Sequence, residues 1–292
     1  LMAAIQLVQP NFVYGLHNSG FGGMYYYISS PFTDIFPQLE RLPASLGLFL
    51  AKGEPEAPWL VQFAPAIFSP LSLRSAYDYY EKYTHTDPVS MMSGGGTTFD
   101  YLEYIHLNET IFFMAELPYF QSPAITNDTL IPNVTQRDDL LLGLDKDNQS
   151  TIIVANLLER IENEITLVSA CYRAFRSLFG LYETSASSRR EAIINDNSTL
   201  APATVATRVD ALYISVFYKM LIVGMLDRAI LLQIDVPSSN VKLLLDAHYE
   251  LQDYLNNWID DIEQNLSYSA INIRTLVQAQ LGAMLAVLPK VK

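Results

Sequence analysis

The chain has 292 residues, of which 50% are apolar and only 17% are charged, a composition that supplies a sizeable core and excludes a disordered protein. Its formal net charge of −13 excludes nucleic acids and anionic membrane surfaces as main partners, because both repel an acidic protein. Residues 1–125 carry 4 basic and 11 acidic side chains, and residues 126–292 carry 14 and 20. Neither half therefore has a basic excess.

The first 125 residues show patterns typical of short strands separated by helices. An extended lead-in is expected at residues 1–8. The expected strands are residues 11–16, ending at His17; residues 24–30, rich in tyrosine; and residues 111–115, ending at Glu116. The expected helices are residues 31–50, kinked at its prolines, residues 71–83, and residues 97–104, with Thr97 or Thr98 as N-cap.

The composition changes near residues 119–137, where prolines and polar residues indicate a loop, and we place a domain boundary at residues 125/126. Beyond it, residues 126–292 predict an all-α bundle or cap. One apolar stripe is expected on a helix that is broken at Gly180, and further helices are expected at residues 203–234, up to residue 265, and at 269–288. The longest apolar run, residues 211–236, contains Lys219, Asp227 and Arg228, so no membrane span is predicted.

His17 and Glu116 are the candidate functional residues because each follows an apolar strand. Ligand sites in open α/β sheets gather at the carboxyl ends of strands. The glycines after His17 allow the backbone to turn there. A carboxylate at the end of a buried strand must be paired, protonated or used in chemistry. A structural histidine and a paired core glutamate are the alternatives.

Two stretches together resemble the second half of the catalytic domain of the zinc carboxypeptidases, the carboxypeptidase A-like metallopeptidases. They are residues 14–31, YGLHNSGFGGMYYYISSP, and residues 93–120, SGGGTTFDYLEYIHLNETIFFMAELPYF. The resemblance implies an α/β fold, a partial mixed-sheet catalytic domain at residues 1–125 followed by the all-α region. It also implies a Zn²⁺ cofactor held in part by His17, Glu116 as general base and acid, and a peptide or protein C-terminus as substrate. Asn18, Phe99 and Asp100 would be weaker candidates for substrate contacts.

The family's other two zinc ligands, a His and a Glu three residues apart, lie upstream of the histidine that matches His17. His106 and Glu109 have that spacing but follow His17, and His85 and His248 have no ligand spacing to each other. We therefore interpret the chain as the C-terminal portion of a longer protein. We expect this portion alone to bind zinc weakly and to be inactive. A tyrosine that the family often has before its Gly-Gly loop is also missing from residues 90–93.

Two other classes stay open: a catalytically inactive peptide-binding pseudoenzyme of the same fold, and a helical interaction module with an α/β appendage. Six Asn-x-Ser/Thr sequons favour a secreted glycoprotein or passage through the secretory pathway, with a cytoplasmic protein as the alternative. The only cysteine, Cys171, excludes an intrachain disulfide and is expected to be a buried apolar residue. The sequons are at Asn108, Asn127, Asn133, Asn148, Asn197 and Asn265.

Overall fold

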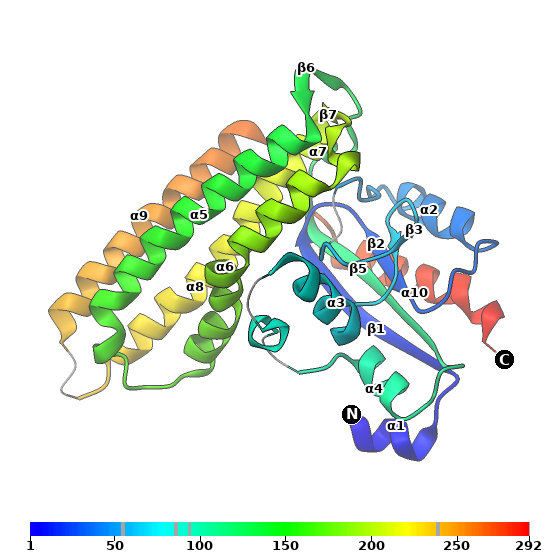
Figure 1. Cartoon of the computed structure of the whole chain (residues 1–292), viewed down its shortest axis with the longest axis horizontal. Helices are drawn as coiled ribbons and strands as arrows, with labels where there is room; N and C mark the ends of the chain where they lie inside the picture. Colours follow the sequence, from blue (N-terminus) through cyan, green and yellow to red (C-terminus); the bar gives the residue numbers. More distant parts are fainter. Residues whose placement is uncertain (54–55, 85–86, 93–94, 238–239, 292) are drawn as a thin grey trace.

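The computed structural model describes residues 1–53, 56–84, 87–92, 95–237 and 240–291. His85 lies outside these ranges, as do Ser93 and Gly94 of the stretch 93–120. The chain forms a mixed α/β body from which a long helical arm extends (Figure 1). The expected α/β class with a mixed sheet is thereby confirmed.

A mixed sheet forms the centre of the body, with strand order β1-β5-β2-β4-β3. β1 runs parallel to β5, β5 antiparallel to β2, and β2 parallel to β4. A separate two-stranded sheet pairs β6 with β7. The strands are β1 (Phe12–Phe21), β2 (Tyr25–Ile28), β3 (Gln62–Ala64), β4 (Ile67–Phe68), β5 (Ile111–Gln121), β6 (Leu130–Thr135), β7 (Pro202–Thr204) and β8 (Ser269–Ala270), which pairs with β5.

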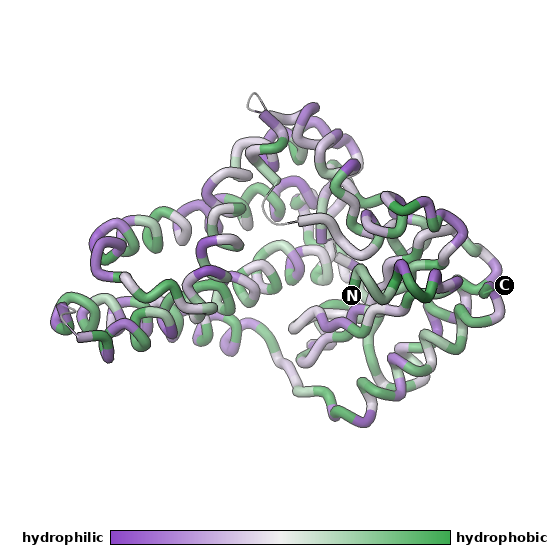
Figure 2. Tube along the Cα trace, turned by 90° about the horizontal axis from the view of Figure 1, so that it is seen from below, coloured by the Kyte–Doolittle hydropathy of each residue, from purple (hydrophilic) through white to green (hydrophobic). Residues whose placement is uncertain are grey.

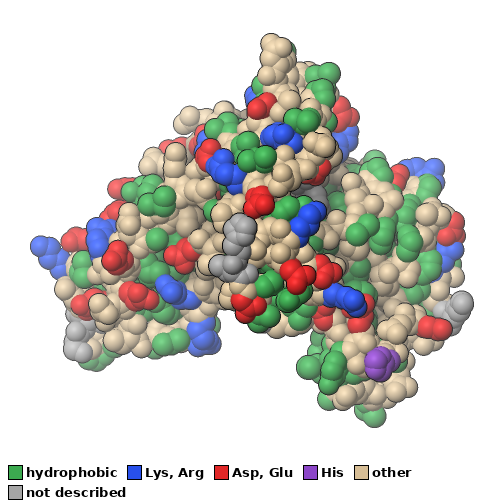
Figure 3. Space-filling view, viewed as in Figure 1, with side chains coloured by type: hydrophobic (Ala, Val, Ile, Leu, Met, Phe, Trp, Pro, Cys, Tyr) green, Lys and Arg blue, Asp and Glu red, His purple; other side chains and the backbone are tan. Residues whose placement is uncertain are grey.

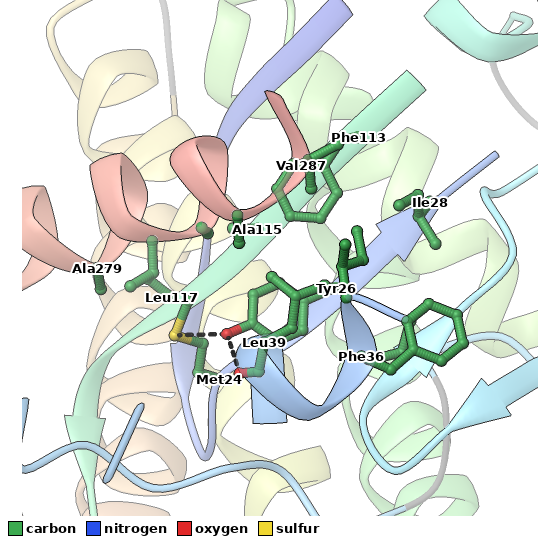
Figure 4. Packing of buried hydrophobic residues seen from close by; sticks show 14 of the residues in the cluster. Met24, Tyr26, Ile28, Phe36, Leu39, Phe113, Ala115, Leu117, Ala279 and Val287 are labelled. Carbon is green, nitrogen blue, oxygen red and sulfur yellow. Dashed lines mark hydrogen bonds between the residues drawn. The ribbon is translucent and has the colours of Figure 1, made fainter. Parts of the chain in front are cut away.

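Alternation along β5 and β2 separates two packed faces of the sheet. Phe113, Ala115 and Leu117 of β5 and Tyr26 of β2 pack with α2 (Phe36–Ser45) and α10 (Ile273–Val287) (Figure 4). The opposite face packs with α1 (Met2–Val8) and α4 (Thr98–Tyr104). Helix α3 (Leu73–Tyr83) packs toward the arm.

Three expectations for the body are corrected. Residues 1–8 are not extended but form α1, because the segment MAAIQLV consists mainly of good helix formers; the helix ends at Gln9, which has a positive φ, before Pro10. The strand with His17 continues to Phe21, and the strand with Glu116 continues to Gln121. Both residues therefore lie inside strands and not at their ends.

The arm consists of α5 (Gln136–Ile161), α6 (Ala170–Asn195), α7 (Val205–Val209) continued by a π-helical turn (Asp210–Ile214) into α8 (Ser215–Ile234), and α9 (Val241–Asn265). The expected single stripe is divided between α5 and α6, and Gly180 lies inside α6 without breaking it. Apolar residues recur along these helices (Figure 2) and form one buried cluster inside the arm. Short 3₁₀ turns occupy Pro88–Met91, Pro123–Thr126, Glu162–Glu164, Asn197–Leu200 and Leu288–Lys290.

The C-terminal segment returns from the arm to the sheet. β8 pairs with β5, and α10 packs against α2 and β5. Buried Ala279, Ala283 and Val287 place one face of α10 in the core of the body. The boundary expected at residues 125/126 did not predict this return. The body is built from residues of both ends of the chain.

One described helix, Val205–Ile234, is long and apolar enough by length and composition to cross a membrane. It lies within the arm, where α8 packs against α6 and α9. Its buried charged residues have partners: Lys219 pairs with Asp147 of α5, and Asp227 pairs with His248 of α9. A core helix of a globular protein passes the same test, so this arrangement is consistent with the expectation of no membrane span.

Candidate functional site

His17 and Glu116 face each other across neighbouring parallel strands. They are register partners in the β1–β5 ladder. Nδ1 of His17 lies 2.7 Å from Oε1 of Glu116 and 2.8 Å from Oε2. The fold therefore brings together the two residues that the sequence singled out, although 99 positions separate them.

The two side chains differ sharply in exposure. The side chain of His17 is 59% exposed, whereas that of Glu116 is 2% exposed. Burial raises the pKa of Glu116 to about 7; the neighbouring His17 opposes this shift, and the charge of Glu56 adds to it. A carboxyl with such a pKa exchanges its proton near neutral pH, which suits a general acid or base.

Tyrosines and a second carboxylate surround Glu116 on this face of the sheet. Tyr25 of β2 is the antiparallel register partner of Glu116. The hydroxyls of Tyr25 and Tyr27 donate to Oε2 of Glu56 at 3.2 and 2.6 Å. Burial, followed by the charge of Glu56, raises the pKa of both phenols far above its usual range, so they stay protonated as donors. Sequence analysis noted the tyrosine-rich strand but missed this role and missed Glu56.

Helix α10 fixes the backbone at the site. Nε2 of Gln280 donates to the carbonyl of His17 at 3.0 Å and to the carbonyl of Ala115, next to Glu116, at 3.1 Å. The hydroxyl of Tyr14, on β1, donates to the carbonyl of Gln280 at 2.8 Å. One glutamine therefore holds both strands in register beside the two candidate side chains. No local pattern in the sequence indicated it.

The weaker candidates lie elsewhere or have structural partners. Asn18 is exposed and, by strand alternation, points to the face opposite His17. The ring of Phe99 packs against Phe112, with centroids 5.9 Å apart. Asp100 accepts hydrogen bonds from the backbone of Thr97 and of Leu73, which joins the first turns of α4 and α3. Asp100 thus has a complete structural role as a cap.

The described residues do not complete a zinc site. They contain no group of three or more His, Cys, Asp or Glu side chains that could hold a metal ion, whereas a catalytic zinc needs three protein ligands. His17 and Glu116 offer at most two donors, and their contact uses Nδ1 of the ring. His106, at the turn between α4 and β5, has a positive φ of 61° and joins no such group.

Comparisons of this chain with protein-family models, with curated proteins and with solved structures found no match.

Proposed function

We propose that this chain carries part of the active site of a zinc-dependent metallocarboxypeptidase, which hydrolyses the C-terminal peptide bond of a peptide or protein. The observation that carries the proposal is the contact between His17 and Glu116 on adjacent parallel strands. The order of three parts along the chain supports it: β1 with His17 comes first, the short helix α4 follows after several other elements, and β5 with Glu116 comes directly after α4.

In this proposal Glu116 is the proton-transferring group. Its pKa near 7 allows it to accept a proton from an attacking water and to pass that proton to the leaving amine. His17 would contribute one metal ligand from its exposed ring. Because the described residues supply too few donors, the remaining ligands would come from polypeptide outside the described residues.

The test compares two proteins, the 292-residue chain and the product of its complete open reading frame. We expect the chain alone to lose its zinc to a chelator and to leave N-blocked dipeptides intact. The complete product should hydrolyse them in a zinc-dependent way, and Glu116→Gln should lower kcat/KM by about a hundredfold or more.

Glu109→Gln, at an exposed position before β5, is the matched control and should keep full activity. A complete product without zinc-dependent hydrolysis, or full activity in Glu116→Gln, would overturn the proposal. Stoichiometric, chelator-resistant zinc in the 292-residue chain would contradict the proposal that this chain lacks some of the zinc ligands.

A catalytically inactive peptide-binding protein of the same fold is the second candidate. The shortage of metal donors among the described residues favours it. Under this alternative the complete product binds peptides that end in a free carboxylate but never cleaves them. Calorimetry with such a peptide, followed by mass analysis of the peptide after incubation, distinguishes the two functions.

We further propose that the protein passes through the secretory pathway. The acceptors Asn127, Asn133, Asn197 and Asn265 are exposed, as is Asn108 in the turn before β5, so an oligosaccharide could be attached without disturbing the core. Asn148 lies within α5 and is the least suitable acceptor. Loss of mass on treatment of the native protein with an N-glycosidase is expected, and an unchanged mass would contradict the proposal.

A further inference from the structure

A cavity of about 580 Å³ lies between the body and the helical arm. Its walls come from the turn between β1 and β2, the loop before β3, helices α5 and α6, and the π-helical turn with α8. Neither His17 nor Glu116 lines it. Small-molecule sites typically have volumes of roughly 300–1,000 Å³ and occur between structural layers, so this cavity has the size and place of a ligand site.

Most of the interior wall is apolar. Its representative residues are Leu140, Leu144, Leu178, Ile214, Ile222 and Met225. Tyr25, Tyr182 and Tyr218 also line the cavity. An occupant therefore needs an apolar body, and the rings offer faces that attract a cation.

The charged groups of the wall are mainly acidic. Three carboxylates, Glu56, Asp147 and Asp210, line the cavity together with one guanidinium, that of Arg189. Asp147 is already neutralised, because Lys219 donates to it and Arg189 lies 3.9 Å away. Acidic side chains also gather near the junction of arm and body on the face that Figure 3 shows.

Glu56 is the carboxylate at the rim of this cavity. It is exposed to solvent, and its hydrogen bonds come from the uncharged hydroxyls of Tyr25 and Tyr27. Among the residues that the structure describes, no Lys, Arg or His forms an ion pair with it. Two phenols thus hold a negative charge in a fixed position beside an apolar cavity.

Close backbone contacts build the walls. A methyl group at Gly143 of α5 would lie 2.4 Å from the carbonyl oxygen of Ala211 in the π-helical turn. A methyl group at Gly53 would lie 2.1 Å from Cγ of Asp210. Glycine at these positions allows α5 and the loop to approach the π turn, and such turns often mark functional sites. Two parts of the cavity wall are therefore formed by tightly packed backbone.

We propose that this cavity binds an organic amine with an apolar, preferably aromatic, body, whose ammonium group pairs with Glu56 at the rim. The body of the ligand then fills the apolar interior between α5, α6 and α8. Charge complementarity at the rim excludes carboxylate analogues of the same shape. The cavity adjoins the His17–Glu116 contact, since Tyr25 and Glu56 belong to the surroundings of both, but neither His17 nor Glu116 lines it. The proposal stands whether or not the chain belongs to a peptidase.

The experiment measures binding to the 292-residue chain by calorimetry and saturation-transfer NMR. The probes are tryptamine and indole-3-propionate, which share an indole body and differ in charge. Tryptamine should bind, more weakly at high salt, and indole-3-propionate should bind at least about tenfold more weakly. No binding of tryptamine at millimolar concentration, or equal binding of both probes, overturns the proposal without any variant being needed.

Two variants locate the site. Glu56→Gln should weaken tryptamine binding by about tenfold, because it removes the negative charge that pairs with the ammonium group. Arg189→Gln should strengthen binding, because it removes a positive charge that repels the ammonium group from the same cavity. Glu109→Gln, at an exposed position that does not line the cavity, should leave tryptamine binding unchanged. Tryptamine binding that is unaffected by Glu56→Gln would place the amine elsewhere and overturn the assignment. None of these readouts depends on zinc or hydrolysis, so failure here is separate from failure of the proposed function.

Discussion

The side-chain amide of Gln280 donates to the main-chain carbonyl of His17, across 263 positions of the sequence. The same nitrogen donates to the carbonyl of Ala115, which precedes Glu116. A helix from the end of the chain thus fixes the relative height of the two strands that bear the candidate side chains. Precise placement of a site depends on such supporting contacts.

Replacing Gln280 by Ala should destabilise the body and loosen the contact between His17 and Glu116. Two carbonyls would lose this donor; the bond to Ala115 is partly buried and the bond to His17 is exposed, so the expected cost in unfolding free energy is about 1 kcal/mol. Urea denaturation measures the loss. Gln278→Ala on the exposed side of the same helix is the control and should change stability by less than about 0.5 kcal/mol. Equal effects of the two variants would contradict the supporting role of Gln280.

The stability contribution of Glu116 should depend on pH. Its pKa is about 7 in the folded protein against 4.5 in the reference state. Between these two values the unfolded chain releases this proton and the folded chain keeps it, so stability is greatest below pH 4.5 and falls as the pH rises through 7. The full change is up to roughly 3 kcal/mol.

The measurement is the difference in unfolding free energy between wild type and Glu116→Gln from pH 4 to 8. Glutamine cannot ionise, so the unfolding free energy of the wild type should fall relative to that of Glu116→Gln as the pH rises over that window. The exposed control Glu109→Gln should give a difference that stays flat. A flat difference for Glu116→Gln as well would mean that the carboxyl is not held protonated by burial.

Asp100 should behave as a helix cap and not as a substrate contact. Its carboxylate accepts from the amides of Thr97 and Leu73, so Asp100→Ala should cost about 1–2 kcal/mol of stability. Glu103→Ala, exposed on the same helix, is the control. If Asp100→Ala left thermal stability unchanged but weakened binding of a peptide C-terminus, the capping interpretation would be wrong and the expectation from the family resemblance would be favoured.

The sequence predicted individual strands and helices of the body better than it predicted their partners. Thr97 is the N-cap of α4, one of the two positions expected, and Asp100, which was expected only as a substrate contact, completes its capping box. The strand of tyrosines near residue 25 also appears as β2. These features depend on residues close together in the sequence, so local sequence patterns are enough to predict them.

Local sequence patterns did not predict the contacts between segments that are distant in the sequence. The sequence predicted a last helix at residues 269–288 but not that one face of it covers the sheet. Glu56 lies in a loop without a motif, so its approach to Tyr25 and Tyr27 had no signal in the sequence. The family resemblance placed His17 and Glu116 in one site but did not predict their direct contact, since no spacing rule sets the register of two parallel strands.

The buried pair of Lys219 and Asp147 gives a test of whether α8 is a core helix. Both side chains are only 4% exposed, and burial lowers the pKa of Lys219 while Asp147 opposes the shift. Lys219→Met should cost up to about 3–5 kcal/mol, because the buried carboxylate of Asp147 then keeps only Arg189, 3.9 Å away, as a charged partner. The double variant Lys219→Met with Asp147→Leu should recover much of that loss, since neither charge then remains. Both are measured by urea denaturation in the absence of detergent or lipid, with the exposed Lys242→Met as the control. A Lys219→Met protein as stable as the control would contradict the buried pair and, with it, the place of α8 inside the arm.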